Sequence, residues 1–503
     1  MSAPLEDYVG TEVFSSGSNK AVRKPTKFLN RSSQPAGIPD GHQVGRPKAL
    51  IKKMTQRVLL GCLAAAIGLA GCSKGGNSAS AASPSISSDS SESPSPAPST
   101  EGPVEIQWMF WGDLESTTDL MTQCYAKVIK RFNEKYEGIY HCTPITTNLE
   151  DYEVKLNARI ASGNAPDVFI CNPGSNLNDI VAAGAAADLT DILKNRETDW
   201  YRTFTNGIFE RLTYGGRIMA VPTNFAAALV SSNTDLFDRA GATVPTTYEE
   251  WLGCCKKLQK AGITPIACSA GTPWCLSMLA GYFCDRAGGP DNLMKINDGT
   301  GSWLDPSFKN GIGKLKELSQ YFQKTAAGDS NDQATAAFYN GECAMLVQGS
   351  WVIGQINGAN PAFEDRCGVF SFPAIKGGAD PNRMIVKTDN LVMSSSTKNV
   401  DASIALMKEF TSDEAQKYTA EVAGKIPVTG VAFDLDKAPK QLGYVQKILA
   451  KSTGTLGFYN ESLATTAAGD TFDNAMLDIF LGTCSVEEGL QKVENFYKMD
   501  IWK

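Results

Sequence analysis

The fold of this chain is decided by residues 104–171, which open with VEIQWMFW at Val104–Trp111 and close with DVFIC at Asp167–Cys171. The expected elements are, in order, a strand at Val104–Trp111, a helix at Asp119–Tyr136, a strand at Tyr140–Thr146, a helix at Asp151–Ile160 and a buried strand at Asp167–Cys171. Strands and helices that alternate in this way predict an α/β sheet. In such sheets the ligand binds outside the carboxyl ends of the strands.

The alternation continues through most of the remaining chain. Further strands and helices are expected from Ala226 to Pro373, and the C-terminal part is mainly helical. Helices are expected at Thr471–Leu481 and Ser485–Tyr497, and Ser485 with Glu488 three residues later predicts a capped start for the second one. The predicted fold class is therefore α/β with extra C-terminal helices.

Length and composition exclude several kinds of function. The chain has 503 residues, 42% hydrophobic and 20% charged, with a formal net charge of −7. It is too long for one ordinary domain, and its acidic balance argues against nucleic-acid binding. Two histidines exclude a His-rich zinc site, and the 13 cysteines contain no Cys-x-x-Cys pair, which disfavours a thiolate metal cluster.

The charge is divided unevenly along the chain. Residues 1–71 hold ten basic and four acidic side chains. The remaining residues hold 37 basic and 50 acidic side chains, which gives this part a net charge of −13. Within the basic part, a positive segment from Lys52 to Arg57 precedes an apolar run from Val58 to Ala70. The run is too short for a transmembrane helix, and its flanks are those of a secretory signal.

The apolar run ends in Leu69-Ala70-Gly71-Cys72, and this segment resembles the lipobox of bacterial lipoproteins. In a lipobox the cysteine thiol is acylated and becomes the mature N-terminus, and two or more acyl chains anchor a protein stably. We therefore expect a lipoprotein signal peptide at residues 54–71 and lipidation of Cys72. The other interpretation is an incidental Ala-Gly-Cys within a core helix.

The flanking segments fit a lipid-anchored protein on the extracytoplasmic face of a cell membrane. Residues 1–53 match no signal peptide, and we interpret them as a disordered extension or as a start-site artefact, since Met54 is an alternative start. Residues 72–103 are dominated by Ser, Ala and Pro and predict a flexible tether. The globular body begins at Val104.

The sequence carries no recognisable enzymatic motif, so no catalytic residue, metal or cofactor is predicted. It lacks a Gly-x-Ser-x-Gly elbow, a phosphate loop, a dinucleotide Gly-x-Gly-x-x-Gly and a His-Glu-x-x-His motif. His141 is expected to be structural. Asp329, Asn331 and Asp332 lack the spacing of a calcium loop and are interpreted as a solvated loop.

Tryptophans beside loop residues are the most informative side chains. Trp111, Trp274 and Trp351 each lie next to Gly, Pro or Ser. Aromatic faces stack on the apolar faces of sugar rings, while neighbouring Asp and Asn side chains bond the hydroxyls. Core packing is the competing interpretation for each indole alone.

Residues 104–503 resemble a family 1 extracellular solute-binding protein, the carbohydrate-binding component of a bacterial ABC importer, related to maltose-binding protein. The segments that carry the resemblance occur in family order at Ala161–Val168, Ala182–Leu189, Tyr214–Pro222, Ser232–Phe237, Pro245–Trp251, Phe338–Met345, Gly349–Trp351, Gly368–Pro373 and Gly424–Val428. Ser232 departs from the family's tyrosine at that position. This departure affects hinge packing but not the class.

The resemblance implies a two-lobed periplasmic-binding-protein fold of type II, the Venus-flytrap arrangement, joined by hinge strands. The first lobe is expected at residues 104–226 and 373–428, and the second at 227–372 and 429–503. A sugar, expected to be an oligosaccharide, would be clamped between the lobes of a monomer and delivered to the permease subunits, with ATP hydrolysed by a separate subunit. Such a protein is not an enzyme.

The resemblance also places the ligand contacts. They are expected at Trp111, Asp113, Asp151, Asn172, Asn224, Trp274, Trp351, Asp389 and Asn390. Trp274 and Trp351 lie where the maltose-binding relatives carry stacking aromatics. Asp113 and Asp151 have a second interpretation as helix caps, and the other polar residues as turn residues. Trp251 and Trp303 are expected to pack in the core.

Three questions stay open at the level of sequence. Eleven cysteines follow Cys72, an odd number, and we expect mostly free thiols, with a Cys124–Cys142 bridge as the alternative. A surface glycoside hydrolase or lyase on the same anchor would need two carboxylates facing each other across the cleft. A sugar-sensing lipoprotein would use the same clamp without transport.

Overall fold

The computed structural model of the protein describes residues 102–116 and 118–503. The expected N-terminal extension, the signal peptide, the lipidation of Cys72 and almost all of the tether lie outside the described residues. Within the described ranges, no helix is long and apolar enough to cross a membrane.

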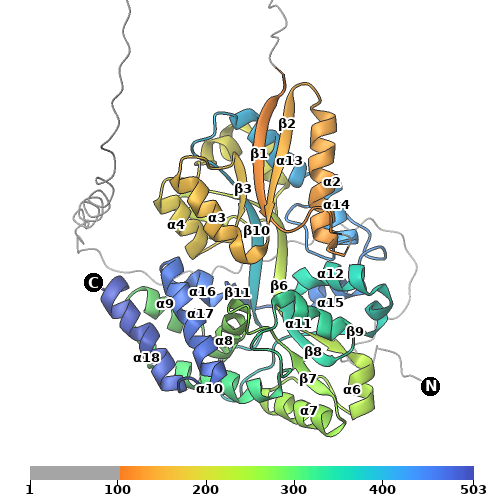
Figure 1. Ribbon diagram of the computed structural model, residues 1–503, viewed down its shortest axis with the longest axis vertical. Helices are drawn as coiled ribbons and strands as arrows, with labels where there is room; N and C mark the ends of the chain where they lie inside the picture. The colour runs from red at the N-terminus through yellow and green to blue at the C-terminus, as the bar shows by residue number, and fades with distance from the viewer. Residues whose placement is uncertain (1–101, 117) are drawn as a thin grey trace, which may run out of the picture. The chain divides into compact units, whose positions relative to one another are not determined.

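The first part of the body has the expected alternation of strands and helices. Its elements are β1 (Val104–Trp111), α2 (Leu120–Lys135), β2 (Tyr140–Thr147), α3 (Leu149–Ala161), β3 (Val168–Cys171) and α4 (Ser175–Ala182). β1 lies between β2 and β3 and is parallel to both. Along β1, Trp108 and Phe110 face Tyr125 of α2, whereas Trp111 packs edge-on against Tyr152 of α3. Helices therefore cover both faces of this sheet (Figure 1).

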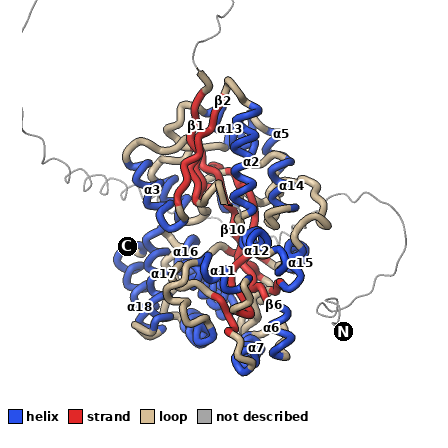
Figure 2. Tube along the Cα trace, turned by 45° about the vertical axis from the view of Figure 1, so that its right-hand side comes forward, coloured by secondary structure: helices blue, strands red, loops and turns tan. Residues whose placement is uncertain are grey.

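Two long antiparallel strands pass through the middle of the body (Figures 1 and 2). They are β6 (Val221–Asn233) and β10 (Arg383–Met393), and the strand order is β2-β1-β3-β10-β6-β8-β7. The first half of β6 pairs with β10, and its second half pairs with β8 (Cys343–Gly349) and β9 (Cys367–Phe370). The β6–β10 register shifts between Asp389 and Asn390.

Helices surround the rest of the sheet. After β6 follow α6 (Thr234–Ala240), α7 (Tyr248–Lys260), β7 (Thr264–Ala267), α8 (Trp274–Gly288), α9 (Asp291–Asn297), α10 (Pro306–Leu318), α11 (Asn331–Tyr339) and α12 (Ile353–Ala359). After β10 follow α13 (Val400–Phe410), α14 (Asp413–Glu421), α15 (Lys440–Leu449), β11 (Gly454–Leu456), α16 (Tyr459–Ser462), α17 (Thr466–Leu481) and α18 (Val486–Phe496). Shorter elements are α5 (Thr198–Thr203), β4 (Thr213–Tyr214) and β5 (Arg217–Ile218). The predicted capping box of Ser485 and Glu488 is confirmed at α18.

The buried side chains form two large cores. One contains Trp108, Phe132 and Phe410, and we call the part built around it the first lobe. The other contains Trp251 and Trp303, and we call its part the second lobe. Both of these tryptophans are 0% exposed, which confirms that they are packing residues.

Three segments of chain cross between the lobes. β6 carries Val221 in the first core and Val230 in the second, and β10 carries Ile385 in the second core and Leu391 in the first. The chain therefore returns to the first lobe within β10, later than the expected point at Pro373. The third crossing follows Val428, the last residue of the first core, and the segment that leads to it pairs with β6 through two backbone hydrogen bonds between Ile426 and Phe225.

The eleven cysteines of the described residues are all unpaired, and ten of them are buried. The alternative of a Cys124–Cys142 bridge is therefore wrong. The Cys124 thiol instead points to the backbone oxygen of Ala415, with the sulfur 3.7 Å from it. Burial raises the pKa of Cys124 to about 11 and that of Cys142 to about 12, so both serve as small apolar side chains at neutral pH.

Candidate functional site

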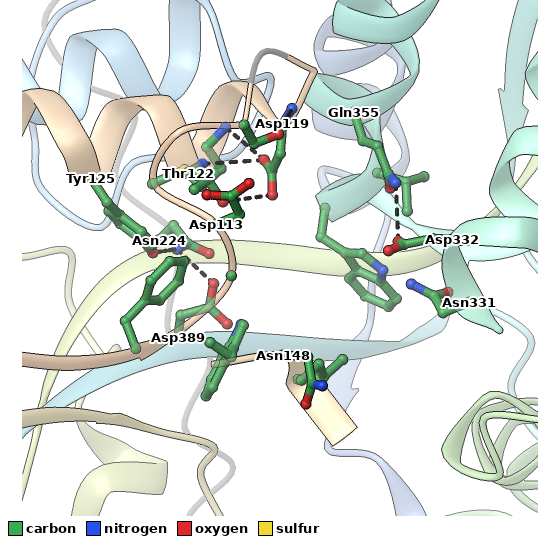
Figure 3. A pocket seen from close by; sticks show the side chains of 18 of the residues that line it. Asp113, Asp119, Thr122, Tyr125, Asn148, Asn224, Asn331, Asp332, Gln355 and Asp389 are labelled. Atoms are coloured by element: carbon green, nitrogen blue, oxygen red, sulfur yellow. Dashed lines mark hydrogen bonds between the residues drawn. The ribbon is translucent and has the colours of Figure 1, made fainter. Parts of the chain in front are cut away.

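A cavity of about 650 Å³ lies between the two lobes. The end of β1, the loop after it and the start of α2 line it from the first lobe, and residues near the starts of α8, α11 and α12 line it from the second. Asn224 of β6 and Asp389 of β10 lie at its base, where the lobes join. Figure 3 shows Asp113 and Asp119 on one side of this cavity and Asn331 and Asp332 on the other.

The wall of the first lobe begins at Trp111, the last residue of β1. Gly112 follows with φ +128°, and a Cβ on it would lie 2.7 Å from Cζ of Phe110, so only glycine allows this turn. Asp113 then accepts a hydrogen bond from the Glu115 amide at 2.9 Å. Asp119 caps α2 through the amides of Met121 and Thr122.

The base of the cavity is a buried network centred on Asp389. Its carboxylate accepts a hydrogen bond from Asn224 Nδ2 at 2.9 Å, and lies 3.2 Å from Lys425 Nζ and 3.8 Å from Lys387 Nζ. Burial alone would raise the pKa of Asp389, but the two ammonium groups and Asn224 offset that effect and lower it to about 2. Asp389 is therefore ionised at any physiological pH.

Three aromatic side chains form a cluster on the wall of the second lobe. Trp274 stacks on Phe458, with ring centroids 5.7 Å apart, and Trp351 packs edge-on against both rings. Trp351 Nε1 also donates a hydrogen bond to Gln348 Oε1 at 3.0 Å. This cluster presents apolar ring surface to the cavity and holds both indoles in fixed orientations.

Polar side chains continue this wall beside the aromatic cluster. Asn331 bonds with Gln348, and Gln355 Nε2 donates to Asp332 Oδ1 at 3.0 Å. Amides and carboxylates beside an aromatic surface supply donors and acceptors for a polyhydroxylated ligand.

Six of the nine sequence-predicted residues line this cavity. They are Trp111, Asp113, Asn224, Trp274, Trp351 and Asp389. Their contact with a ligand stays a prediction.

The other three predicted residues lie elsewhere. Asp151 is exposed and pairs with Lys155 one turn along α3, and Asn148 fills the helix-cap role that was the second interpretation for Asp151. Asn390 is 0% exposed and donates to the backbone oxygens of Cys171 and Thr388, and it lies in β10 where the register with β6 shifts. Asn172 lines a second, smaller cavity of about 280 Å³, which shares Trp111 with the first.

Sequence reasoning missed several residues that line the large cavity. The main ones are Asp119, Asn148, Asn331, Asp332, Gln355, Lys387, Lys425 and Phe458. A weak sequence signal marks Asn331 and Asp332, which stand beside Asp329; both lie in the first turn of α11 and not in the solvated loop expected there. Lys387 adjoins the predicted Asp389 segment, and Lys425 lies within the Gly424–Val428 segment that carries the family resemblance, whereas no such signal marks Phe458.

Comparison with known proteins identifies the class. Residues 115–417 match the family model of bacterial extracellular solute-binding proteins, so the chain belongs to this family of binding proteins. The multiple sugar-binding protein of Streptococcus mutans is 25% identical over 62% of this chain and 74% of its own length. The sn-glycerol-3-phosphate-binding periplasmic protein of Shigella flexneri is 25% identical over 70% of this chain and 80% of its own length.

Solved structures show the same fold. A chitin oligosaccharide binding protein superimposes with a TM-score of 0.72 and 25% identity, over 79% of this chain and 98% of its own. The expected family and its two-lobed α/β fold are thereby confirmed.

Proposed function

We propose that the protein is the lipid-anchored substrate-binding component of an ABC importer, which captures an oligosaccharide between its lobes and delivers it to the permease. The anchor is Cys72, and the protein acts as a monomer on the extracytoplasmic face of the cell membrane. The observation that carries the proposal is the cavity between the lobes, which Trp274 and Trp351 line from the second lobe and Asp113, Asp119 and Asn148 line from the first.

The arrangement explains how binding would drive closure. A ligand in the cavity touches the first lobe through Trp111 and Asp113 and the second through Trp274 and Trp351. Because both sets of contacts form only when the lobes approach, the ligand stabilises the closed state over the open one. Delivery then requires only that the permease recognise the closed state. ATP is hydrolysed by a separate subunit of the importer.

The ligand class is proposed from the chemistry of the walls and from the relatives. Indole faces stack on sugar rings, and paired Asp and Asn oxygens match vicinal hydroxyls. The Streptococcus mutans and chitin oligosaccharide proteins are named for sugars, whereas the Shigella flexneri protein is named for a glycerol phosphate. The aromatic cluster favours the sugar.

A thermal-shift screen of the full chain against mono- and oligosaccharides tests the proposal. A true ligand at a hundred times its dissociation constant stabilises the folded state by about 2.7 kcal/mol. A response to glycerol 3-phosphate alone, with none to any sugar, would overturn the sugar assignment. A product assay on the same oligosaccharides checks the alternative that the protein cleaves them.

Trp351→Ala tests the aromatic wall directly. Removal of this ring is expected to weaken calorimetric affinity for the sugar about tenfold or more, because a stacking face is lost, while the fold persists. Trp502→Ala is the matched control, since Trp502 is also partly buried but bonds to Ile296 outside the cavity. Equal sugar affinities of Trp351→Ala and the unaltered protein would show that Trp351 does not contact the ligand.

A further inference from the structure

The cavity between the lobes has an unequal balance of charge. Four carboxylates line it, Asp113, Asp119, Asp332 and Asp389, against two ammonium groups, Lys387 and Lys425. The two kinds of group are not spread evenly over its walls. Both lysines approach Asp389 at the base, and the other carboxylates lie on the two walls (Figure 3).

Both lysines compensate the charge of Asp389 and are not free to pair with a ligand. The Lys425 side chain is 8% exposed and hydrogen-bonds Asp389 at 3.2 Å, and the Lys387 side chain is 21% exposed and lies 5.5 Å from the centre of the Trp111 ring. If either ammonium group turned to an anionic ligand, Asp389 would be left buried with less compensation. Breaking a buried pair in this way is strongly unfavourable.

The remaining three carboxylates have only neutral partners. Asp113 accepts from a backbone amide, Asp119 from two amides and the Thr122 hydroxyl, and Asp332 from the Gln355 amide. Among the described residues, no ion pair involves any of these three. Asp113 belongs to the first lobe and Asp332 to the second, and closure would bring both toward the same ligand.

We propose that this cavity selects its sugar by charge, accepting neutral sugars and protonated amino sugars and rejecting uronic acids and sugar phosphates. The inference rests on the proposed function and deepens it. A carboxylate or phosphate on the ligand would approach unpaired carboxylates on both walls, whereas a hydroxyl or an ammonium group would bond to them. The same argument separates this site from one for a glycerol phosphate.

Matched sugar triplets test the proposal with the full chain. Each skeleton is offered as the neutral hexoside, the 2-amino sugar and the uronic acid, in mono- and disaccharide form, at about pH 6, where the amine is protonated and the acid ionised. We expect at least one skeleton to bind in its neutral or amino form, with the uronic acid weaker by roughly tenfold or more. High salt is expected to reduce this difference in affinity, because salt screens the repulsion between the carboxylates of the cavity and that of the ligand.

Variants assign the effect to residues. The double variant Asp113→Asn, Asp332→Asn is expected to reduce the difference in affinity between the neutral sugar and the uronic acid. Glu249→Gln removes an exposed carboxylate at the start of α7, outside the cavity, and is expected to leave this difference unchanged. A uronic acid that binds the unaltered protein as tightly as its neutral partner would overturn charge selection but leave sugar binding intact. Absence of binding by every triplet member would instead overturn the proposed function.

Discussion

Trp351 owes its position to a residue two places before it. A Cβ on Gly349 would lie 2.1 Å from Cζ3 of the Trp351 indole, so the ring lies directly against the Gly349 backbone. The Gly349 φ of −138° is ordinary, and the glycine is required for space rather than for backbone conformation. In the Gly-Ser-Trp sequence, the missing side chain of Gly349 thus leaves the space in which the Trp351 indole packs against the end of β8.

Gly349→Ala is therefore expected to displace the indole and weaken sugar affinity about as much as Trp351→Ala, roughly tenfold, although no ring is removed. Calorimetry measures the affinity, and tryptophan fluorescence reports the altered environment. Gly253→Ala is the control, because a Cβ at that helical position meets nothing within 4 Å. Its unfolding free energy is expected to rise by about 0.5–1 kcal/mol with affinity unchanged. Retained affinity in Gly349→Ala would show that the ring finds an equivalent position.

At the scale of elements, one tyrosine ties the two hinge strands together. The Tyr282 hydroxyl of α8 donates to the backbone oxygen of Ala228 in β6 at 2.7 Å and accepts from the amide of Ile385 in β10 at 3.1 Å. Trp274 begins the same helix. One rigid helix therefore connects an indole in the cavity with both strands that cross between the lobes.

Tyr282→Phe is expected to lower the free energy of unfolding by about 1–3 kcal/mol, because a buried carbonyl and a buried amide each lose this partner. Chemical denaturation measures the loss. Tyr339→Phe, on the less buried face of α11, is the comparison and is expected to change little. Equal stability of Tyr282→Phe and the unaltered protein would mean that water or a shifted backbone satisfies both groups.

A buried glutamate lies where α16 meets the first lobe. Glu461 is 6% exposed, its Oε2 has no hydrogen-bond partner among the described residues, and its backbone oxygen lies so near Gly174 that a Cβ there would be 1.9 Å away. Burial raises the pKa of Glu461 to about 7, and Glu153 and Asp389 act in the same direction. Lys387 and Arg211 only partly oppose this rise.

The raised pKa predicts a pH dependence of stability. Below the usual glutamate pKa, Glu461 is protonated in both the folded and unfolded states, and its contribution to stability is fully present. As the pH rises toward 7, the unfolded chain releases the proton first, so the folded state loses stability. Glu461→Gln is expected to be more stable than the unaltered protein by on the order of 3 kcal/mol at about pH 8, with the difference vanishing near pH 4.

Denaturant titrations of both proteins across this pH range measure the difference. Asp473, whose pKa burial also raises to about 7, titrates in both proteins, and Glu461→Gln removes only the last and smallest of the effects that raise this pKa. Glu249→Gln serves again as the exposed control. A stability difference that does not vary with pH would contradict the assignment to Glu461.

For the whole molecule, strands shared by both lobes predict a coupled response to ligand. β6 and β10 each contribute to both cores, so neither lobe has a sheet of its own. Saturating sugar is expected to raise the temperature of a single unfolding transition. Calorimetry would contradict this coupling if it resolved two transitions and the ligand shifted only one.

The local sequence pattern predicts many of the strands and helices of the described residues. β1, α2, β2, α3 and β3 follow from hydrophobic alternation and periodicity, and the cap of α18 from Ser485 and Glu488. The cavity was predicted in part, since loop tryptophans and the polar ends of strands are visible in sequence.

The remainder depends on contacts between distant segments. Lys425 meets Asp389 only because the segment after α14 crosses beside β6, and Phe458 reaches Trp274 only through the packing of the α16 region on α8. Asn390 is buried in the sheet at a register shift and does not line the large cavity, a placement that alternation does not encode.

The interleaving of the lobes along the chain also sets the order in which they are completed during synthesis. The first core begins at Ile106 but lacks Leu391–Met393 until β10 has been made, and it ends only at Val428. The second core is complete only when Tyr497 has been added to the chain. β3 therefore has an unpaired edge while most of the chain is still to be made, an edge that invites misassociation. This edge stays open until β10 has been made, so the first lobe is completed only when most of the second has already been synthesised.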